Sequence, residues 1–182
     1  MNILNLITAI VVLSVIIILI VFAFFNLAVS LAGTPYVPSK RKMIFRALKD
    51  VNPEPNSVFM DLGCGDGYIV RHVAKRFKVN SIGIDINPLL IGFAKVLSFL
   101  TGTSRRTRFI CNDIFRSNFS HADYVFLYLM PSLLEKLGPR LAHECKPGTI
   151  IISNTFPIRR LRPYLTKTIP YKKLDVFVYR IP

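Results

Sequence analysis

The chain has 182 residues and a formal net charge of +14 at neutral pH, and all of its charged side chains lie after Ser39. Such a basic chain is expected to meet an anionic partner, which can be phospholipid headgroups, nucleic acid or acidic protein. Its three cysteines show no CxxC spacing, which argues against a disulfide framework or a zinc site and favours a reducing compartment. No metal site is predicted.

Residues 1–33 are predicted to form an uncleaved transmembrane anchor. The run from Ile3 to Ala32 is apolar except for Asn, Ser and Thr, and it exceeds the roughly 20 residues that span a bilayer core. A cleaved signal peptide is the alternative, but the run lacks a positive n-region and is longer than an ordinary h-region. Basic residues follow the run and none precede it. The positive-inside rule therefore predicts a single-pass membrane protein whose remaining chain lies on the cytoplasmic or matrix side.

Residues 34–52 are predicted to form a short linker and then an amphipathic helix. Ser39 can cap this helix, and its apolar residues recur at helical spacing opposite a basic face, namely Met43, Ala47, Leu48 and Val51. Two roles stay open for the helix, packing on the domain core and contact with anionic headgroups. The linker is short, so the domain that follows is expected to stay close to the membrane surface.

Residues 53–182 alternate between strand-like and helix-like patterns. The predicted strands are 57–62, 81–85, 107–113, 122–130 and 149–155, and the predicted helices are 68–77, 88–100 and 132–144. This alternation predicts an α/β domain with a parallel, doubly wound sheet. The final runs, 166–174 and 175–181, have no helix between them and are expected to add an antiparallel pair at the sheet edge.

The stretch "DLGCGDG" follows the first predicted strand and should lie where ligands bind in such sheets. Gly63 and Gly65 would let the backbone approach a ligand, and Gly67 would let the next helix pack closely. A dinucleotide loop reads GxGxxG, whereas this loop reads GxGxG behind the acidic Asp61. Because a carboxylate repels phosphates, the loop favours a cationic ligand, and S-adenosylmethionine fits that charge.

Two further carboxylates close neighbouring predicted strands. Asp85, some twenty residues after the glycines, is placed to accept the hydroxyls of a ribose. Asp113, or the backbone beside it, is placed to meet the exocyclic amine of an adenine. Either aspartate alone would indicate no more than a turn residue, but the three features together indicate a nucleoside-containing cofactor.

The chain resembles the class I methyltransferases and, more closely, a family of membrane-anchored protein-lysine methyltransferases. The family is typified by the lysine methyltransferases of the ATP synthase c-subunit and the adenine nucleotide translocase. The resemblance rests on an anchor followed by "PYVPS", "DLGCGDG", "INPLL", "MPS" and "SNTFP" in that order. It implies a Rossmann-like fold, S-adenosylmethionine as cofactor and methylation of a lysine in a membrane protein.

The resemblance also implies roles for individual residues. Asp61 and the three glycines would hold the methionine part of the cofactor, and Asp85 would hold the ribose. Asn112 and Asp113 would contact the adenine. Tyr36 would close over the cofactor.

The substrate mouth is predicted from the segments that follow the fourth and fifth strands. Tyr128 is the candidate catalytic residue, and Met130, Pro131 and Phe156 are candidate lining residues, although an aromatic residue in such a place is more often part of the core. Two other functions stay open: methylation of nucleic acid, lipid or a small molecule at the membrane, and a non-catalytic basic adaptor. Basic clusters in "SRRTR" and "RRLR" can track phosphates, but base methylation is disfavoured because the tetrapeptide ending in two prolines and an aromatic is absent.

Overall fold

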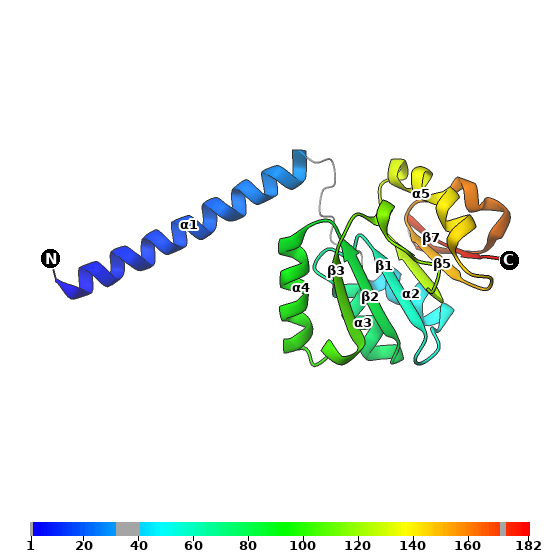
Figure 1. Ribbon diagram of the computed structural model, residues 1–182, viewed down its shortest axis with the longest axis horizontal. Coiled ribbons are helices and arrows are strands. Elements are labelled where there is room, and N and C mark those ends of the chain that lie inside the picture. The colour runs from blue at the N-terminus through cyan, green and yellow to red at the C-terminus, as the bar shows by residue number, and fades with distance from the viewer. Residues whose placement is uncertain (1, 32–40, 172–173) are drawn as a thin grey trace. The chain divides into compact units, whose positions relative to one another are not determined.

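The computed structural model describes residues 2–31, 41–171 and 174–182. It divides into two compact units. Helix α1 (Ile3–Leu31) belongs to the first unit, and every other helix and strand belongs to the second (Figure 1).

Helix α1 is long and apolar enough to cross a membrane. Its window Ile3–Ile20 has a mean hydropathy of 3.1, and none of that window is buried against protein. The hydroxyls of Thr8 and Ser14 donate to the carbonyls of Leu4 and Ile10 within the helix, each at 2.8 Å. These polar side chains are therefore satisfied by their own backbone, as an apolar surrounding requires.

The second unit is built on one seven-stranded sheet in the order β3-β2-β1-β4-β5-β7-β6. The strands are β1 (Val58–Leu62), β2 (Asn80–Asp85), β3 (Thr107–Cys111), β4 (Tyr124–Leu127), β5 (Ile150–Asn154), β6 (Leu165–Tyr171) and β7 (Leu174–Arg180). The first five are parallel, whereas β7 pairs antiparallel with both β5 and β6. The predicted fold class and its antiparallel edge are therefore confirmed.

Helices cover the sheet on both faces. The helices of this unit are α2 (Arg41–Val51), α3 (Tyr68–Phe77), α4 (Pro88–Leu100) and α5 (Pro131–Glu144), with short 3-10 turns η1 (Ser104–Arg106), η2 (Ile114–Arg116) and η3 (Arg159–Tyr164). Buried residues of α2 and α3 form one core cluster with Phe59 and Phe126, and those of α5 form another with Leu62 and Val125. Side chains alternate along β1 and β4, so each strand supplies both layers.

Helix α2 packs on the domain core. Ile44, Ala47 and Leu48 are fully buried in the cluster that contains α3, and the Phe45 ring stacks on His72 of α3 with centroids 3.8 Å apart. The sequence leaves two roles open for this helix, core packing and contact with anionic headgroups. The structure shows core packing. Its predicted cap, Ser39, lies outside the described residues.

The fourth strand is shorter than its sequence pattern. The apolar run continues to Met130, but pairing with β5 ends at Leu127, and the chain then passes without regular structure into α5, which begins at Pro131. Between β3 and β4 the connection holds only the turn η2. This connection therefore crosses the sheet without an α-helix.

Candidate active site

The order of the strands reverses between β1 and β4, because the chain winds outward from β1 through β2 to β3 and then returns to β4 beside β1. At such a switch point the loops after the two strands diverge and leave a crevice at their carboxyl ends. The glycine loop follows β1, and Tyr128 follows β4. The glycine loop and Tyr128 thus both lie at the carboxyl end of the parallel strands.

Two glycines of the loop are required by close approach and backbone conformation. Gly67 has φ 69°, and a Cβ there would lie 2.3 Å from the Phe109 ring on β3. Gly63 has φ 83°, and a Cβ there would lie 2.8 Å from the Leu129 side chain. Both φ values lie in the left-handed region that favours glycine. Gly67 therefore lets α3 start against the sheet, as its position in the sequence predicts.

The amides of the loop are already paired within the protein. Gly63 N and Cys64 N both donate to the carbonyl of Ile84, at 2.8 and 3.0 Å, and Gly67 N donates to the carbonyl of Cys64. Gly65 N donates to Oδ2 of Asp85 at 2.9 Å. A phosphate-binding loop presents free amides to its ligand, and these four are committed. These four amides are therefore not available to a pyrophosphate.

Three carboxylates surround the loop. Asp61 is 3% exposed at the end of β1, and its pKa is raised well above the ordinary value, first by burial and then by the charges of Asp85 and Asp66. A positively charged ligand would relieve both effects, because it supplies the opposite charge that the buried group lacks. The carboxylates of this site fit the cationic methyl donor predicted from the sequence.

Asp85 connects the second strand to the loop. Its Oδ2 accepts from Gly65 N, and its Oδ1 accepts from Asn87 N at 2.9 Å. Asn87 in turn caps α4, because its side chain accepts from the amides of Leu89 and Leu90. Each carboxylate oxygen has a second lone pair, so Asp85 can fix the loop and still accept hydroxyls.

The end of the third strand is joined to the second. Asn112 N donates to the Asp85 carbonyl at 3.0 Å, and the Asn112 side chain donates to the Ser117 hydroxyl at 3.2 Å. The Asp113 carboxylate accepts from Phe115 N at 2.9 Å and caps η2. The structure thus brings Asp61, Asp85 and Asp113 to neighbouring strand ends, and it also gives Asp113 the turn-forming role that any such aspartate can have.

The predicted substrate residues lie after β4 and β5. Tyr128 is half-buried and packs against the cluster shared by α2 and α3. Met130 is 46% exposed, and Pro131 is exposed in the first turn of α5. Phe156 is half-buried against the cluster on the α5 side. Tyr36 lies outside the described residues.

Asn154 is the feature that the sequence reasoning missed. It ends β5, one position beyond the pair of Leu127 and Ser153, and Tyr128 follows β4 at the corresponding position. Asn154 is 1% exposed, and neither its amide nitrogen nor its amide oxygen has a hydrogen-bond partner in the described chain. Thr155 has an unpaired hydroxyl as well, and its φ of 75° is rare for a β-branched residue. Unpaired buried amides and strained backbone are costly and gather at functional sites.

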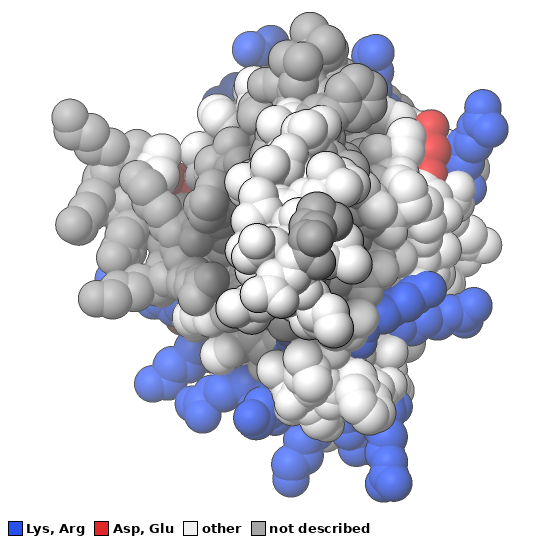
Figure 2. Space-filling model, turned by 90° about the vertical axis from the view of Figure 1, so that its left-hand side faces the viewer, with Lys and Arg blue, Asp and Glu red and all other residues white. Residues whose placement is uncertain are grey.

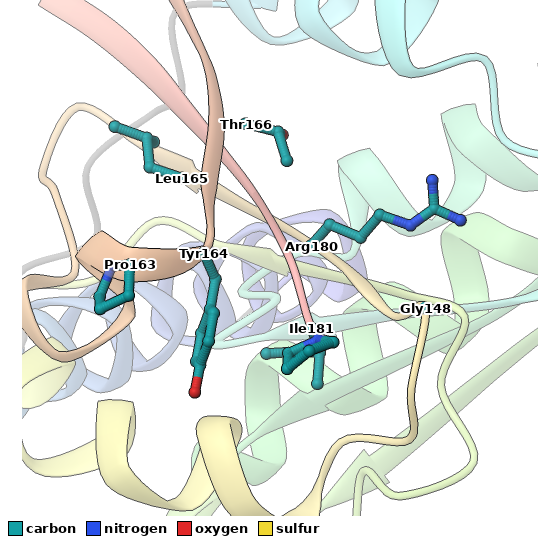
Figure 3. A pocket seen from close by; sticks show the side chains of 8 residues that line it. Gly148, Pro163, Tyr164, Leu165, Thr166, Arg180 and Ile181 are labelled. Carbon is teal, nitrogen blue, oxygen red and sulfur yellow. The ribbon is translucent and has the colours of Figure 1, made fainter.

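A separate pocket of about 480 Å³ lies at the opposite edge of the sheet. It is bounded by Gly148 before β5 and Arg180 at the end of β7, and Figure 3 shows the Arg180 side chain extending away from Tyr164. The lining residues carry an arginine but no carboxylate side chain. The glycine loop, by contrast, has three aspartates around it, so the candidate active site is placed there and not in this pocket.

Residues 61–165 match the family described as the ANTKMT methyltransferase domain. The chain belongs to the ANTKMT methyltransferase family. The match begins at Asp61 and covers the glycine loop, Asp85, Asp113 and the ends of β4 and β5. The predicted class of enzyme is confirmed, and the family assignment makes S-adenosylmethionine its cofactor.

Several relatives of this ANTKMT family chain are named lysine methyltransferases. A protein-lysine N-methyltransferase of Saccharolobus islandicus is 35% identical over 130 residues, which cover 71% of this chain and 81% of the relative. The human lysine N-methyltransferase of the ATP synthase c-subunit is 26% identical, and the mouse adenine nucleotide translocase lysine N-methyltransferase is 27% identical. These matches cover 71% of this chain but only 54% and 56% of the mammalian proteins.

A solved structure is also similar over most of the domain. It is an RNA methyltransferase of Salinibacter ruber in complex with S-adenosyl-L-homocysteine. Its TM-score to the ANTKMT family chain is 0.76 at 32% identity, and the match covers 80% of this chain and 94% of the other. The bound product of S-adenosylmethionine in that structure supports the cofactor assignment.

Proposed function

We propose that this protein is a membrane-anchored methyltransferase that N-methylates a lysine of a membrane protein. The observation that carries the proposal is the apolar helix α1 on a domain whose family includes protein-lysine methyltransferases. Two of the named relatives act on the ATP synthase c-subunit and the adenine nucleotide translocase. The target in this case is a membrane protein of the same compartment, with its lysine near the bilayer surface.

The cofactor site is proposed at the carboxyl ends of β1, β2 and β3. Asp61 and the loop glycines Gly63, Gly65 and Gly67 hold the methionine part, and Asp85 accepts the ribose hydroxyls. Asn112 and Asp113 contact the adenine, and Tyr36 closes the site. When bound, S-adenosylmethionine supplies a methyl group on a positively charged sulfur. The protein's part is to hold an amine in line with that bond and to exclude water.

The lysine amine is proposed to bind between the ends of β4 and β5. Its nitrogen must lose a proton before it can act as a nucleophile, and removal from water lowers the pKa of an amine. Asn154 offers an amide oxygen that accepts no hydrogen bond in the described chain, and Tyr128 offers a hydroxyl from the neighbouring position. These groups can accept hydrogen bonds from the N–H groups of the neutral amine and so orient its lone pair. Met130, Pro131 and Phe156 line the mouth.

The anchor supports a site at a membrane. Because Lys40, Arg41 and Lys42 follow the apolar segment, the positive-inside rule supports a domain on the cytoplasmic or matrix side. The domain begins its first helix within ten residues of the end of α1. Its substrates are therefore expected in or on the same bilayer.

Labelled methyl transfer tests the substrate class. Full-length protein is incubated with native membranes and S-adenosylmethionine that carries a heavy methyl group, and modified residues are located by mass spectrometry. We expect label on lysine of a membrane protein. Label in RNA or lipid instead would contradict the proposal.

The variant Asp85→Ala serves as the inactive control for that experiment. It removes the acceptor for Gly65 N and Asn87 N as well as the ribose contact, so it should abolish cofactor binding and labelling together. Cofactor affinity close to that of the unmodified protein would show that the ribose site is misplaced.

Methylation of RNA is the second candidate. It is favoured by the 32% identity to the Salinibacter ruber RNA methyltransferase and by exposed arginines on η1 and η3, namely Arg105, Arg159, Arg160 and Arg162. Adding extracted RNA to the same assay separates RNA methylation from lysine methylation. If RNA is the substrate, RNA labelling should match or exceed protein labelling. The non-catalytic adaptor makes a different prediction: calorimetry would detect anionic lipid binding without S-adenosylmethionine binding.

A further inference from the structure

Helix α4 exposes an apolar face to solvent. Leu89, Phe93, Val96 and Leu100 recur at i, i+4, i+7 and i+11, and each is more than half exposed. They therefore lie in one stripe along the helix. Ile86 before the helix and Phe99 near its end are 67% and 76% exposed. We call Ile86 together with these five helix residues the α4 face.

The opposite side of α4 is already packed. Ile91, Ala94 and Ser98 are buried, and Ile91 and Ala94 form a core cluster with Cys64, Val70 and Phe109. The helix borders β3 at the end of the sheet (Figure 1). The exposed apolar residues are thus not required for the domain's core. A contiguous apolar patch of this kind on a folded domain marks an interaction surface.

The chain segment that carries the α4 face is basic. Between Ile86 and Asn112 the chain has no Asp or Glu, whereas it has Lys95, Arg105, Arg106 and Arg108. Lys95, Arg105 and Arg108 are exposed. In Figure 2, Lys and Arg side chains stand out around the outline of the molecule, and few acidic side chains are visible. An apolar stripe with basic side chains in the same segment is the pattern of a helix that lies in a membrane interface.

The chain also limits where the α4 face can go. Residues 32–40 connect α1 to α2, and ten residue steps extend at most about 36 Å. If α1 spans a bilayer, as the proposed function has it, the domain stays at the bilayer surface. The lipid surface is then always close to the α4 face. A soluble partner, in contrast, would have to diffuse to it, so lipid is the favoured occupant.

We propose that the α4 face docks into the anionic lipid surface of the membrane that α1 spans. The apolar side chains enter the boundary between headgroups and acyl chains, and Lys95, Arg105 and Arg108 contact lipid phosphates. This proposal rests on the anchor of the proposed function. Helix α4 begins at Pro88, three residues after Asp85, so docking would hold the cofactor edge of the sheet beside the interface, where lysines of membrane proteins emerge.

Spin-label accessibility tests the docking directly. The full-length protein is placed in vesicles of phosphatidylcholine and phosphatidylglycerol, with the exposed Cys111 replaced by Ser and the buried Cys64 and Cys145 retained. One label is attached at Val96→Cys and a matched control label at Lys136→Cys, an exposed position on α5. We expect the label at 96 to collide more with oxygen than with a water-soluble nickel complex, and the label at 136 to show the reverse.

Three results would overturn the docking. A label at 96 that is as accessible to nickel as the label at 136 would show that the face stays in water. A label at 96 shielded from both reagents would show that protein covers the face. Equal insertion into vesicles of phosphatidylcholine alone would remove the role of anionic lipid.

A charge variant provides the second arm. Phe93→Glu with Leu100→Glu should move the label at 96 into water, while S-adenosylmethionine affinity stays within about twofold because both side chains are outside the core. A label that stays in lipid contradicts the proposal. The measurement needs no methyl acceptor, so it is independent of the substrate assignment. A chain that does not float with vesicles overturns the anchor and the docking together, whereas a floating chain with label 96 in water overturns the docking alone.

Discussion

Asp61 makes the stability of the cofactor-free protein depend on pH. Burial and the neighbouring carboxylates raise its pKa, so the folded chain binds this proton more tightly than the unfolded chain. The resulting stability is fully present below the unfolded pKa of about 3.9 and is lost as the pH rises through the raised pKa. Asp61→Asn cannot ionise, so its melting temperature should exceed that of the unmodified protein by a margin that grows with pH.

The same variant should bind S-adenosylmethionine roughly tenfold more weakly or worse, because a buried opposite charge is lost. Thermal melts across the pH range and calorimetry measure the two effects. Asp123→Asn is the matched control, since Asp123 pairs with Lys146 at the start of β4, away from the cofactor edge. A margin that shrinks with pH, or equal cofactor affinity in both variants, would contradict the assignment.

Asn154 should be needed for methyl transfer and not for stability. Asn154→Leu removes an unpaired buried amide, so the free energy of unfolding should rise by about 1–3 kcal/mol or stay unchanged. The rate of methyl transfer should fall roughly ten- to a hundredfold because the amine loses its orientation. Denaturant unfolding, turnover and cofactor calorimetry measure these effects. Ser153→Ala, which removes a hydroxyl bonded to the Phe156 carbonyl, should leave turnover nearly unchanged.

Among individual residues, the sequence predicts those that belong to a motif with characteristic spacing. Asp61 and Asp85 follow apolar strands and frame a glycine motif, so their meeting at one edge can be foreseen. Asn154 has no such signal, because an asparagine after a strand is ordinary and only its burial without a partner sets it apart. The second role of Asp85, as acceptor for Gly65 N, is equally invisible before the loop is folded.

Helix α2 is tested by a core substitution. Leu48 is fully buried among residues of the main cluster, so Leu48→Ala should lower the free energy of unfolding by about 2–5 kcal/mol. The neighbouring exposed Lys49→Ala should change it by less than about 0.5 kcal/mol. Denaturant unfolding of the full chain in detergent measures both. Equal small effects would mean that α2 is not part of the core.

The helices also show where sequence patterns stop being informative. The bounds of α3 and α4 are those that the pattern predicts, and their starts are marked by Gly67 and by Asn87 with Pro88. The role of α4 could not be predicted, since "PLLIGFAKVLSFL" is apolar on every side and does not say which side faces the sheet. The amphipathic pattern of α2 is equally consistent with contact to anionic headgroups and with packing on the domain core. Only the fold shows that its apolar side packs on the core.

The net charge of the whole molecule should appear in its salt dependence. Raising the ionic strength from about 0.1 M to 1 M shortens the Debye length from about 10 Å to 3 Å. Attraction of the basic domain to anionic lipid then weakens, so KM for a substrate embedded in anionic vesicles should rise several-fold. The affinity for S-adenosylmethionine should change much less, because Asp61 is buried and poorly screened. Vesicle assays at several salt concentrations measure this, and a KM that does not change would contradict it.

The paired amides of the glycine loop have a consequence for turnover. A loop that is already hydrogen-bonded needs little ordering when a ligand arrives and little rearrangement when it departs. Transfer of a methyl group turns a sulfonium into a neutral thioether, so the carboxylates of Asp61, Asp66 and Asp85 attract the spent cofactor less than the fresh one. The exchange of product for new cofactor is then favoured by a change of charge on the ligand, and the glycine loop itself needs little rearrangement.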